Sequence, residues 1–104
     1  MIEKNKQNLT LVRVYTDDGN CDLDKVLDTL SNNQAIIGLT VFRGIAGFGP
    51  HHKLHKATFI DLSAKLPIVI EFFHKTEEVE KIINNMHQLI KKAHIVNWAV
   101  NLSF

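Results

Sequence analysis

Two kinds of hydrophobic spacing alternate along this chain of 104 residues, and their order is the feature that most constrains its fold. Two segments repeat apolar residues three and four positions apart, which is typical of a helix with one buried side. Four other segments are rich in β-branched and aromatic residues, which favours strands. The expected strands cover residues 9–15, 36–48, 67–73 and 95–102, and the helices follow Asp22 and Thr76 as capping residues. The pattern predicts the order β-α-β-β-α-β.

This order is typical of the α+β ferredoxin-like sandwich, a four-stranded antiparallel sheet with two helices on one face. A chain of this length is expected to form a single domain, residues 1–104. Its polar first residues, 1–8, are expected to form a loose arm, and residues 49–57 a flexible loop. A short extended piece is expected at Thr58–Ile60.

Several of the expected strands are apolar on both faces, although two helices can cover only one face of the sheet. In strand 67–73 the side chains alternate between one face with Ile68, Ile70 and Phe72 and another with Val69, Glu71 and Phe73. An uncovered apolar sheet face is a larger exposed patch than soluble monomers usually carry. The sequence therefore predicts a homo-oligomer packed through the face without helices.

Composition excludes several function classes. The formal net charge is only +1, so no affinity for nucleic acid or for an anionic membrane surface is expected from charge alone. No apolar run approaches the roughly 20 residues of a membrane helix. The single cysteine, Cys21, next to Asp22, predicts an unreactive thiol, and with no secretory signal pattern the protein is expected to be cytoplasmic. No nucleophile stands in a recognisable catalytic setting, so we expect a protein that is not an enzyme.

The stretch from Gly38 to Gly49, followed by histidines and a lysine, is the main candidate for a binding function. Glycines allow positive φ and close approach of the backbone, and their N–H groups can hold an anion. His51, Lys53 and His55 can supply charge or hydrogen bonds to such an anion. Arg43 fits either a phosphate contact or, slightly better, an ion pair between subunits, with Glu71 as a candidate partner.

The histidines also carry an alternative. His51, His52 and His55 form a His-His-x-x-His cluster, and neutral imidazole is a common ligand of zinc, copper and nickel. This spacing favours a divalent-metal site in the loop as the competing hypothesis. His74, His87 and His94 are expected to be surface residues.

The string Gly-Leu-Thr-Val-Phe-Arg-Gly-Ile-Ala-Gly-Phe-Gly at 38–49, followed by His55 and by Leu-Pro-Ile-Val-Ile-Glu-Phe at 66–72, resembles a known family. From about Leu9 to Leu102 the chain is similar to the P-II signal-transduction superfamily, and most similar to its P-II-like branch called domain of unknown function 190. It departs from P-II proteins in having His51 where they carry glutamine, and in lacking their glycine-rich phosphate loop before the last strand.

The resemblance implies a homotrimer with small-molecule sites in the clefts between subunits. It implies a sensor that binds a small anionic metabolite, with an adenine nucleotide favoured, and acts on a partner such as a membrane transporter or an enzyme through the loop after the second strand. By position, Thr40 and the turn Gly47-Phe48-Gly49 match the part of the P-II motif that lines the nucleotide cleft. The divalent-cation tolerance proteins, which share this architecture, are the model for the metal-binding alternative.

Overall fold

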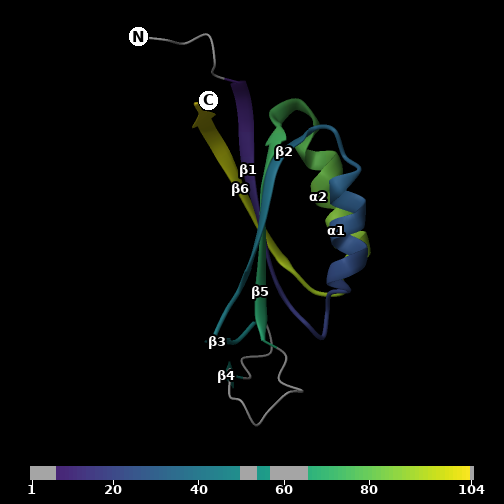
Figure 1. Cartoon of the computed structure of the whole chain (residues 1–104), viewed down its shortest axis with the longest axis vertical. Coiled ribbons are helices and arrows are strands. Elements are labelled where there is room, and N and C mark those ends of the chain that lie inside the picture. The colour runs from purple at the N-terminus through teal and green to yellow at the C-terminus, as the bar shows by residue number, and fades with distance from the viewer. Residues whose placement is uncertain (1–6, 50–53, 57–65, 104) are drawn as a thin grey trace.

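One antiparallel sheet and two helices make up the part of the chain that the computed structural model describes, residues 7–49, 54–56 and 66–103, with the backbone alone for Gln7 and His55. The main elements follow the predicted β-α-β-β-α-β order (Figure 1). Their bounds are β1 Gln7–Asp17, α1 Leu23–Ser31, β2 Ile36–Arg43, β3 Ala46–Gly47, β4 His55–Lys56, β5 Pro67–Lys75, the 3-10 turn η1 Thr76–Glu78, α2 Val79–Leu89 and β6 His94–Leu102.

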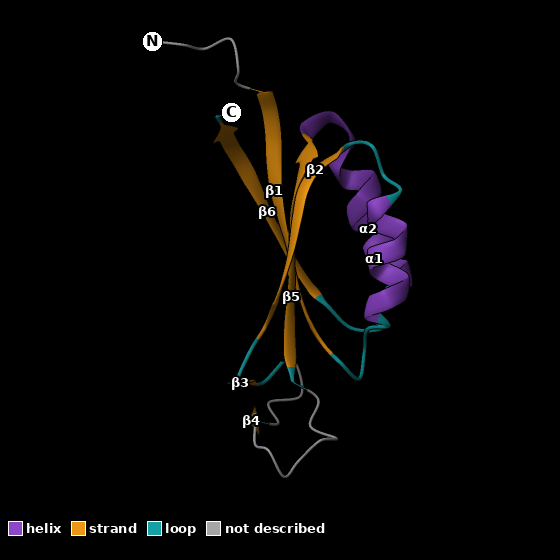
Figure 2. Ribbon diagram, in the orientation of Figure 1, coloured by secondary structure: helices purple, strands orange, loops and turns teal. Residues whose placement is uncertain are grey.

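The four long strands pair in the order β2-β5-β1-β6, and all three pairings are antiparallel. Both helices lie on the same side of this sheet (Figure 2). The α+β ferredoxin-like fold predicted from the sequence is therefore confirmed. No helix among the described residues is long and apolar enough to cross a membrane.

The core lies between the sheet and the helices. The side chains of β5 alternate strictly: Ile68, Ile70 and Phe72 are fully buried beneath the helices, and the residues between them are partly exposed. The helices contribute the apolar stripes that their spacing predicts. The buried cluster consists of Val12, Val14, Cys21, Val26, Leu30, Ile68, Ile70, Phe72, Ile82, Met86 and Ile90.

The opposite side of the sheet, which we call the open face, carries apolar side chains without a helix over them. The pairing register arranges these side chains in rows across the four strands. One row reads Ile37, Phe73, Leu11, Trp98, the next reads Thr40, Glu71, Arg13, Val96, and the third reads Phe42, Val69, Tyr15, His94. Both faces of β5 are thus largely apolar, as its sequence predicts.

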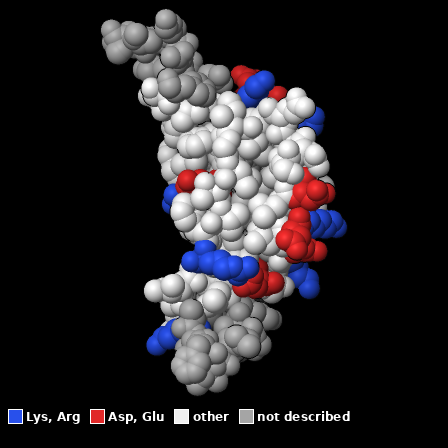
Figure 3. Space-filling model, in the orientation of Figure 1, with Lys and Arg blue, Asp and Glu red and all other residues white. Residues whose placement is uncertain are grey.

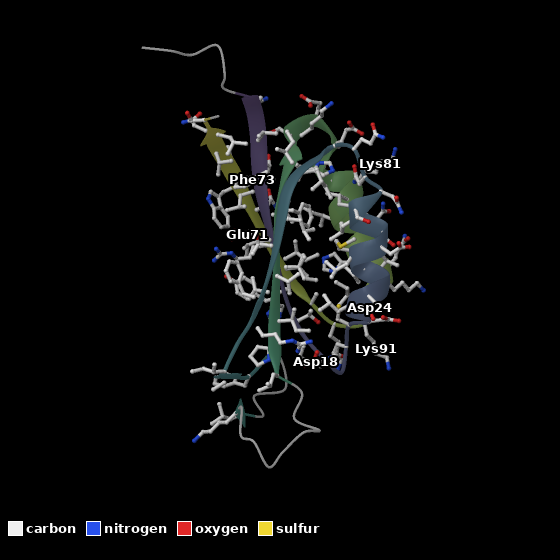
Figure 4. All side chains as sticks on the ribbon, viewed as in Figure 1. Asp18, Asp24, Glu71, Phe73, Lys81 and Lys91 are labelled. Atoms are coloured by element: carbon white, nitrogen blue, oxygen red, sulfur yellow. The ribbon has the colours of Figure 1, made fainter. Side chains whose placement is uncertain are left out.

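The two sides of the sheet also differ in the labelled side chains of Figure 4. Glu71 and Phe73 point away from the helices, whereas Asp24, Lys81 and Lys91 lie on the helical side. In the space-filling view, charged residues gather over the helical side and in a band across the lower part of the molecule (Figure 3). Between them lies a broad uncharged area.

A β-bulge in β2 decides which of its side chains reach the open face. Ile37 pairs with Phe73 and Leu39 with Phe72, so Gly38 is an extra residue in the strand. Its φ is +78°, which favours glycine. After the bulge, Leu39 and Val41 lie on the helical side and Thr40 and Phe42 on the open face, as the two-residue period predicts.

Several boundaries differ from the predictions. β1 begins at Gln7, inside the expected loose arm, and residues 1–6 lie outside the described residues. The expected strand 36–48 is interrupted after Arg43, and Ala46–Gly47 pairs instead with His55–Lys56 in a separate two-stranded ribbon. This ribbon occupies part of the expected loop 49–57; the expected piece at Thr58–Ile60 lies outside the described residues.

The two predicted helix caps have different outcomes. The Asp22 side chain accepts a hydrogen bond from the backbone N–H of Lys25, so it caps α1 as predicted. The Thr76 cap is wrong, because neither η1 nor α2 begins with a side-chain capping bond. The Oγ1 of Thr76 instead lies 2.9 Å from the Oγ1 of Thr10, so this hydroxyl bonds across to β1.

Candidate functional site

A half-open cleft of about 590 Å³ lies at the end of the sheet where β1 finishes and β5 and β6 begin. The chain turns between β2 and β3 at the same end, close to β5. The described lining residues are Tyr15, Thr16, Asp17, Asn20, Gly44, Ala46, Gly47, Phe48, Gly49, Pro67, Ile68, Val69, Lys92, Ala93, His94 and Val96. Its size is within the range of small-molecule sites, about 300–1,000 Å³.

The glycines of this cleft let the chain after β2 pass close to β5. The backbone N–H of Gly44 donates a 2.8 Å hydrogen bond to the carbonyl of Pro67. A Cβ on Gly44 would lie 2.7 Å from Cγ of Pro67, and one on Gly47 would lie 3.0 Å from it. A side chain at Gly44 would therefore require the Pro67 ring or the chain at Gly44 to shift, which gives this glycine the close-approach role that the sequence predicts.

The opposite side of the cleft is formed by the segment between α2 and β6. Two contacts hold this segment against the end of β1 and the turn after it. Thr16 donates a 2.8 Å hydrogen bond from Oγ1 to the carbonyl of Lys92, and the N–H of Lys91 donates to the carbonyl of Asn20 at 2.9 Å. These bonds place Lys92 and His94 at the cleft, facing the glycine turn.

The described lining carries one basic side chain, Lys92, one acidic side chain, Asp17, and the imidazole of His94. Asp17 is its only acid, and the carboxylate of Asp17 is engaged within the turn after β1. It accepts hydrogen bonds from the N–H groups of Gly19 and Asn20 at 2.8 and 2.9 Å, and from the side-chain amide of Asn20 at 3.0 Å. Lys92 supplies a cationic group, His94 supplies an imidazole that can form hydrogen bonds, and Tyr15, Phe48 and Val96 supply aromatic and apolar surface.

The structure brings together only some of the residues that the sequence singled out. Gly47, Phe48 and Gly49 line the cleft, whereas Thr40 and Arg43 are not among its described lining residues. Thr40 lies beside Glu71 on the open face. His51, His52 and Lys53 lie outside the described residues, and so does the side chain of His55, whose backbone pairs with Gly47 in the ribbon.

Within one chain Arg43 pairs with Asp18 and not with Glu71, while the pairing between subunits stays a prediction. Its Nη1 donates to both carboxylate oxygens of Asp18, at 2.7 and 2.6 Å, and this carboxylate raises the pKa of Arg43 above its usual value. Glu71 is taken by Arg13, whose Nε donates to Oε1 of Glu71 at 2.9 Å. The reason is geometric: Arg13 and Glu71 are directly opposite each other on the open face, while Arg43 follows the helical side of β2.

The remaining histidines and the cysteine have mixed outcomes. The prediction that His74 is a surface residue is wrong, because its side chain is buried and the residue is 1% exposed. Its Nδ1 lies 2.9 Å from the carbonyl of Lys75 and its Nε2 lies 3.4 Å from the side-chain amide of Asn33. His87 and His94 are exposed as predicted. Cys21 is buried, and burial together with nearby aspartates raises the pKa of its thiol, which agrees with the unreactive cysteine predicted.

The sequence missed the cleft residues Tyr15, Asn20, Lys92 and His94. They come from opposite ends of the chain, and no local motif joins them. The predicted strand order could have indicated these residues, because in this fold the end of β1 lies next to the start of the last strand.

Comparison with known proteins identifies the chain at the level of family. Residues 9–102 match the model of domain of unknown function 190, described as "Uncharacterized ACR". The chain is also 29% identical, over 62 residues, to a "UPF0166 protein" of Aquifex aeolicus (strain VF5); the match covers 60% of this chain and 59% of that relative. Because the family model covers nearly the whole chain, from β1 to β6, the protein belongs to the P-II-like family called domain of unknown function 190.

Proposed function

We propose that this protein is a trimeric, cytoplasmic P-II-like sensor that binds a small anionic metabolite, with an adenine nucleotide favoured, and that it is not an enzyme. One observation carries this proposal: the glycine turn Gly47–Gly49, the cationic side chain of Lys92 and the imidazole of His94 border the same cleft. Backbone N–H groups of a glycine turn and cationic side chains are the groups that proteins use to bind phosphates and carboxylates.

The lining also suits the planar part of such a ligand. Tyr15 and Phe48 offer aromatic rings, and Pro67, Val69 and Val96 offer apolar surface. Aromatic faces bind planar heterocycles through offset stacking, while the charged end of the ligand reaches the cationic group. A nucleotide carries both features in one molecule, and this favours it over a simple inorganic anion.

The open face and the position of the cleft support assembly of several copies, and the number three is the one that the family resemblance implies. Tyr15, Val69 and Val96 belong both to the open face and to the cleft lining. A second copy that covers the open face would therefore border the half-open cleft and help to enclose a ligand. In this arrangement the ligand lies between subunits.

We assign contact with the partner protein to the region of the β3–β4 ribbon. Ile45, Phe48 and Leu54 are 81%, 60% and 54% exposed, which is unusual for large apolar side chains so close together in a short segment. The ribbon extends beyond the end of the sheet (Figure 1). A ligand that contacts Gly47–Gly49 would bias the conformation of this region, and a transporter or an enzyme would read that change.

Isothermal titration calorimetry against AMP, ADP and ATP, with and without Mg²⁺, tests the ligand class. We expect measurable binding by the wild type, and a loss of at least about tenfold in affinity in Lys92→Ala, because a charge-assisted hydrogen bond contributes about 1.5–3 kcal/mol. Lys91→Ala is the matched control, since Lys91 is the neighbouring lysine but is not a described lining residue.

Two results would contradict the proposal. Absence of heat with every nucleotide would exclude the ligand class. Equal losses in Lys91→Ala and Lys92→Ala would show that only the general charge of this segment matters, and that the cleft is not the binding site.

A further inference from the structure

Among the described residues, the open face has one charged pair near its centre. In the row Thr40, Glu71, Arg13, Val96, the guanidinium of Arg13 contacts the carboxylate of Glu71 through both Nε and Nη2. The rows on either side are apolar or aromatic except for His94 at one end. The pair is thus flanked on both sides by apolar and aromatic side chains of the open face.

Arg13 is held in place by three neighbours. In addition to its bonds with Glu71, its Nη1 lies 3.4 Å from the hydroxyl of Tyr15, and its Cζ lies 5.9 Å from the centroid of the Trp98 ring. The hydrogen bond with Tyr15 and the carboxylate of Glu71 raise the pKa of Arg13 above its usual value. These contacts come from β1, β5 and β6, so the charged group is fixed relative to three strands.

In an isolated chain this pair would have little effect. Its side chains are 35% and 19% exposed, and partly solvated ion pairs contribute little to stability. A pair of this kind gains importance when another surface covers it, because the guanidinium and the carboxylate then lose their water. An arrangement of the copies that leaves their remaining polar atoms without hydrogen-bond partners is disfavoured. The aromatic side chains around the pair are large and partly exposed, so a covering surface would bury them. Their exposed fractions are 41% for Tyr15, 45% for Trp98 and 49% for Phe42.

A second copy of this chain is the occupant that the charges favour. Arg13 and Glu71 neutralise each other within one chain, so two identical open faces meet without net repulsion. A partner with a strongly acidic or basic surface would gain nothing from a face whose central charges are already paired. Continuity with the cleft points the same way, since Tyr15 and Val96 belong to both surfaces.

We propose that the Arg13–Glu71 pair orients copies of this chain against one another through the open face and selects one assembly from the several that an apolar face permits. This proposal rests on the trimer of the proposed function and adds a residue-level determinant to it. Polar groups within an apolar interface are known to fix register and oligomeric state in this way. Arg13 and Glu71 are positioning residues here, with no contact to the ligand required.

Analytical ultracentrifugation over a range of protein concentrations tests the proposal with three variants, Arg13→Leu, Glu71→Leu and the double variant. Each single variant leaves one charge without its partner, so the concentration at which the assembly dissociates should rise at least about 30-fold. The double variant leaves no charge and should assemble again, but as a mixture of stoichiometries instead of a single trimer. Arg43→Leu breaks the Arg43–Asp18 pair away from the open face and should leave the wild-type assembly unchanged.

The outcomes separate this proposal from the trimer itself. A wild type that stays monomeric at every concentration would overturn both. A trimeric wild type whose single variants dissociate no more readily than Arg43→Leu, or a double variant that forms one sharp trimer, would overturn the orienting role alone. Circular dichroism checks that each variant is folded; should a leucine variant lose its secondary structure, Arg13→Lys and Glu71→Gln replace it, with weakened assembly expected again.

Discussion

Gly38→Ala tests whether the β-bulge in β2 depends on its glycine. The native φ is +78°, and a non-glycine residue in this region costs about 1–3 kcal/mol. The added Cβ would lie 3.6 and 3.9 Å from two ring carbons of Phe73, which is ordinary van der Waals contact and adds no clash. Alanine also lowers the conformational entropy of the unfolded chain, and this stabilises the folded state by about 0.4–1 kcal/mol. The free energy of unfolding should fall by about 1.3 kcal/mol, within limits of about 0 and 2.6 kcal/mol.

For a domain of this size, each kcal/mol corresponds to about 4–8 °C in Tm. Thermal unfolding followed by circular dichroism at one fixed protein concentration measures the effect; the concentration matters because assembly would itself raise Tm. Gly38→Asn should lower Tm less than Gly38→Ala does, since asparagine adopts positive φ more readily than alanine.

Gly49→Ala is the control for the bulge experiment. A Cβ on Gly49 meets no atom within 4 Å, and its φ is not in the positive region. The reasoning is refuted if Gly38→Ala lowers Tm no more than Gly49→Ala does, or if asparagine and alanine at position 38 are equally destabilising. Either result would mean that β2 can pass the bulge without a positive φ.

Three further predictions concern the core, the helix caps and the thiol. Phe72→Ala should lower the free energy of unfolding in urea by about 3–5 kcal/mol, because this ring is fully buried; a loss below 1 kcal/mol would contradict the described packing. Asp22→Ala should cost about 1 kcal/mol through loss of the α1 cap, and Glu78→Ala at the uncapped start of α2 should cost less. The pKa of Cys21 is higher in the folded protein than in the unfolded chain, so the native state becomes less stable as pH rises above the usual thiol pKa of about 8.5. Cys21→Ala should remove the part of the fall in unfolding free energy at alkaline pH that comes from this thiol. Urea titrations of the wild type and the variant between pH 7 and 10 measure it, and the same pH dependence in both proteins would contradict the buried thiol.

Much of the fold could be predicted because each main element has a hydrophobic period of its own. The alternation in β5 and the buried positions Val26 and Leu30 of α1 are direct consequences of periods of two and 3.6 residues. The errors arose where a side chain found a distant partner. Thr76 bonds to Thr10 in place of its own helix, and His74 is buried at the end of a strand where the position alone suggested exposure.

The candidate site could be predicted only in its local half. The turn Gly47–Gly49 is a continuous motif and was found, whereas Tyr15 and His94 enter the cleft through pairing of β1 with β6, across most of the chain. Arg43 shows the same limit: Asp18 and Glu71 are both plausible partners in the sequence, and only the facing of the strands selects Asp18. Periodicity says which face a residue takes, but not which neighbour it meets there.

The strand order β2-β5-β1-β6 has a consequence for how the protein is made. Every pairing in this sheet joins a strand that ends by Arg43 to a strand that starts at or after Pro67, and β1 never pairs with β2. As the chain leaves the ribosome, its first two strands therefore have no sheet partner until β5 emerges. Non-local pairing of this kind slows folding. During that interval the apolar strands β1 and β2 lack the strands that pair with them, and a chain cut after residue 66 would lack both β5 and β6 and could not form this sheet.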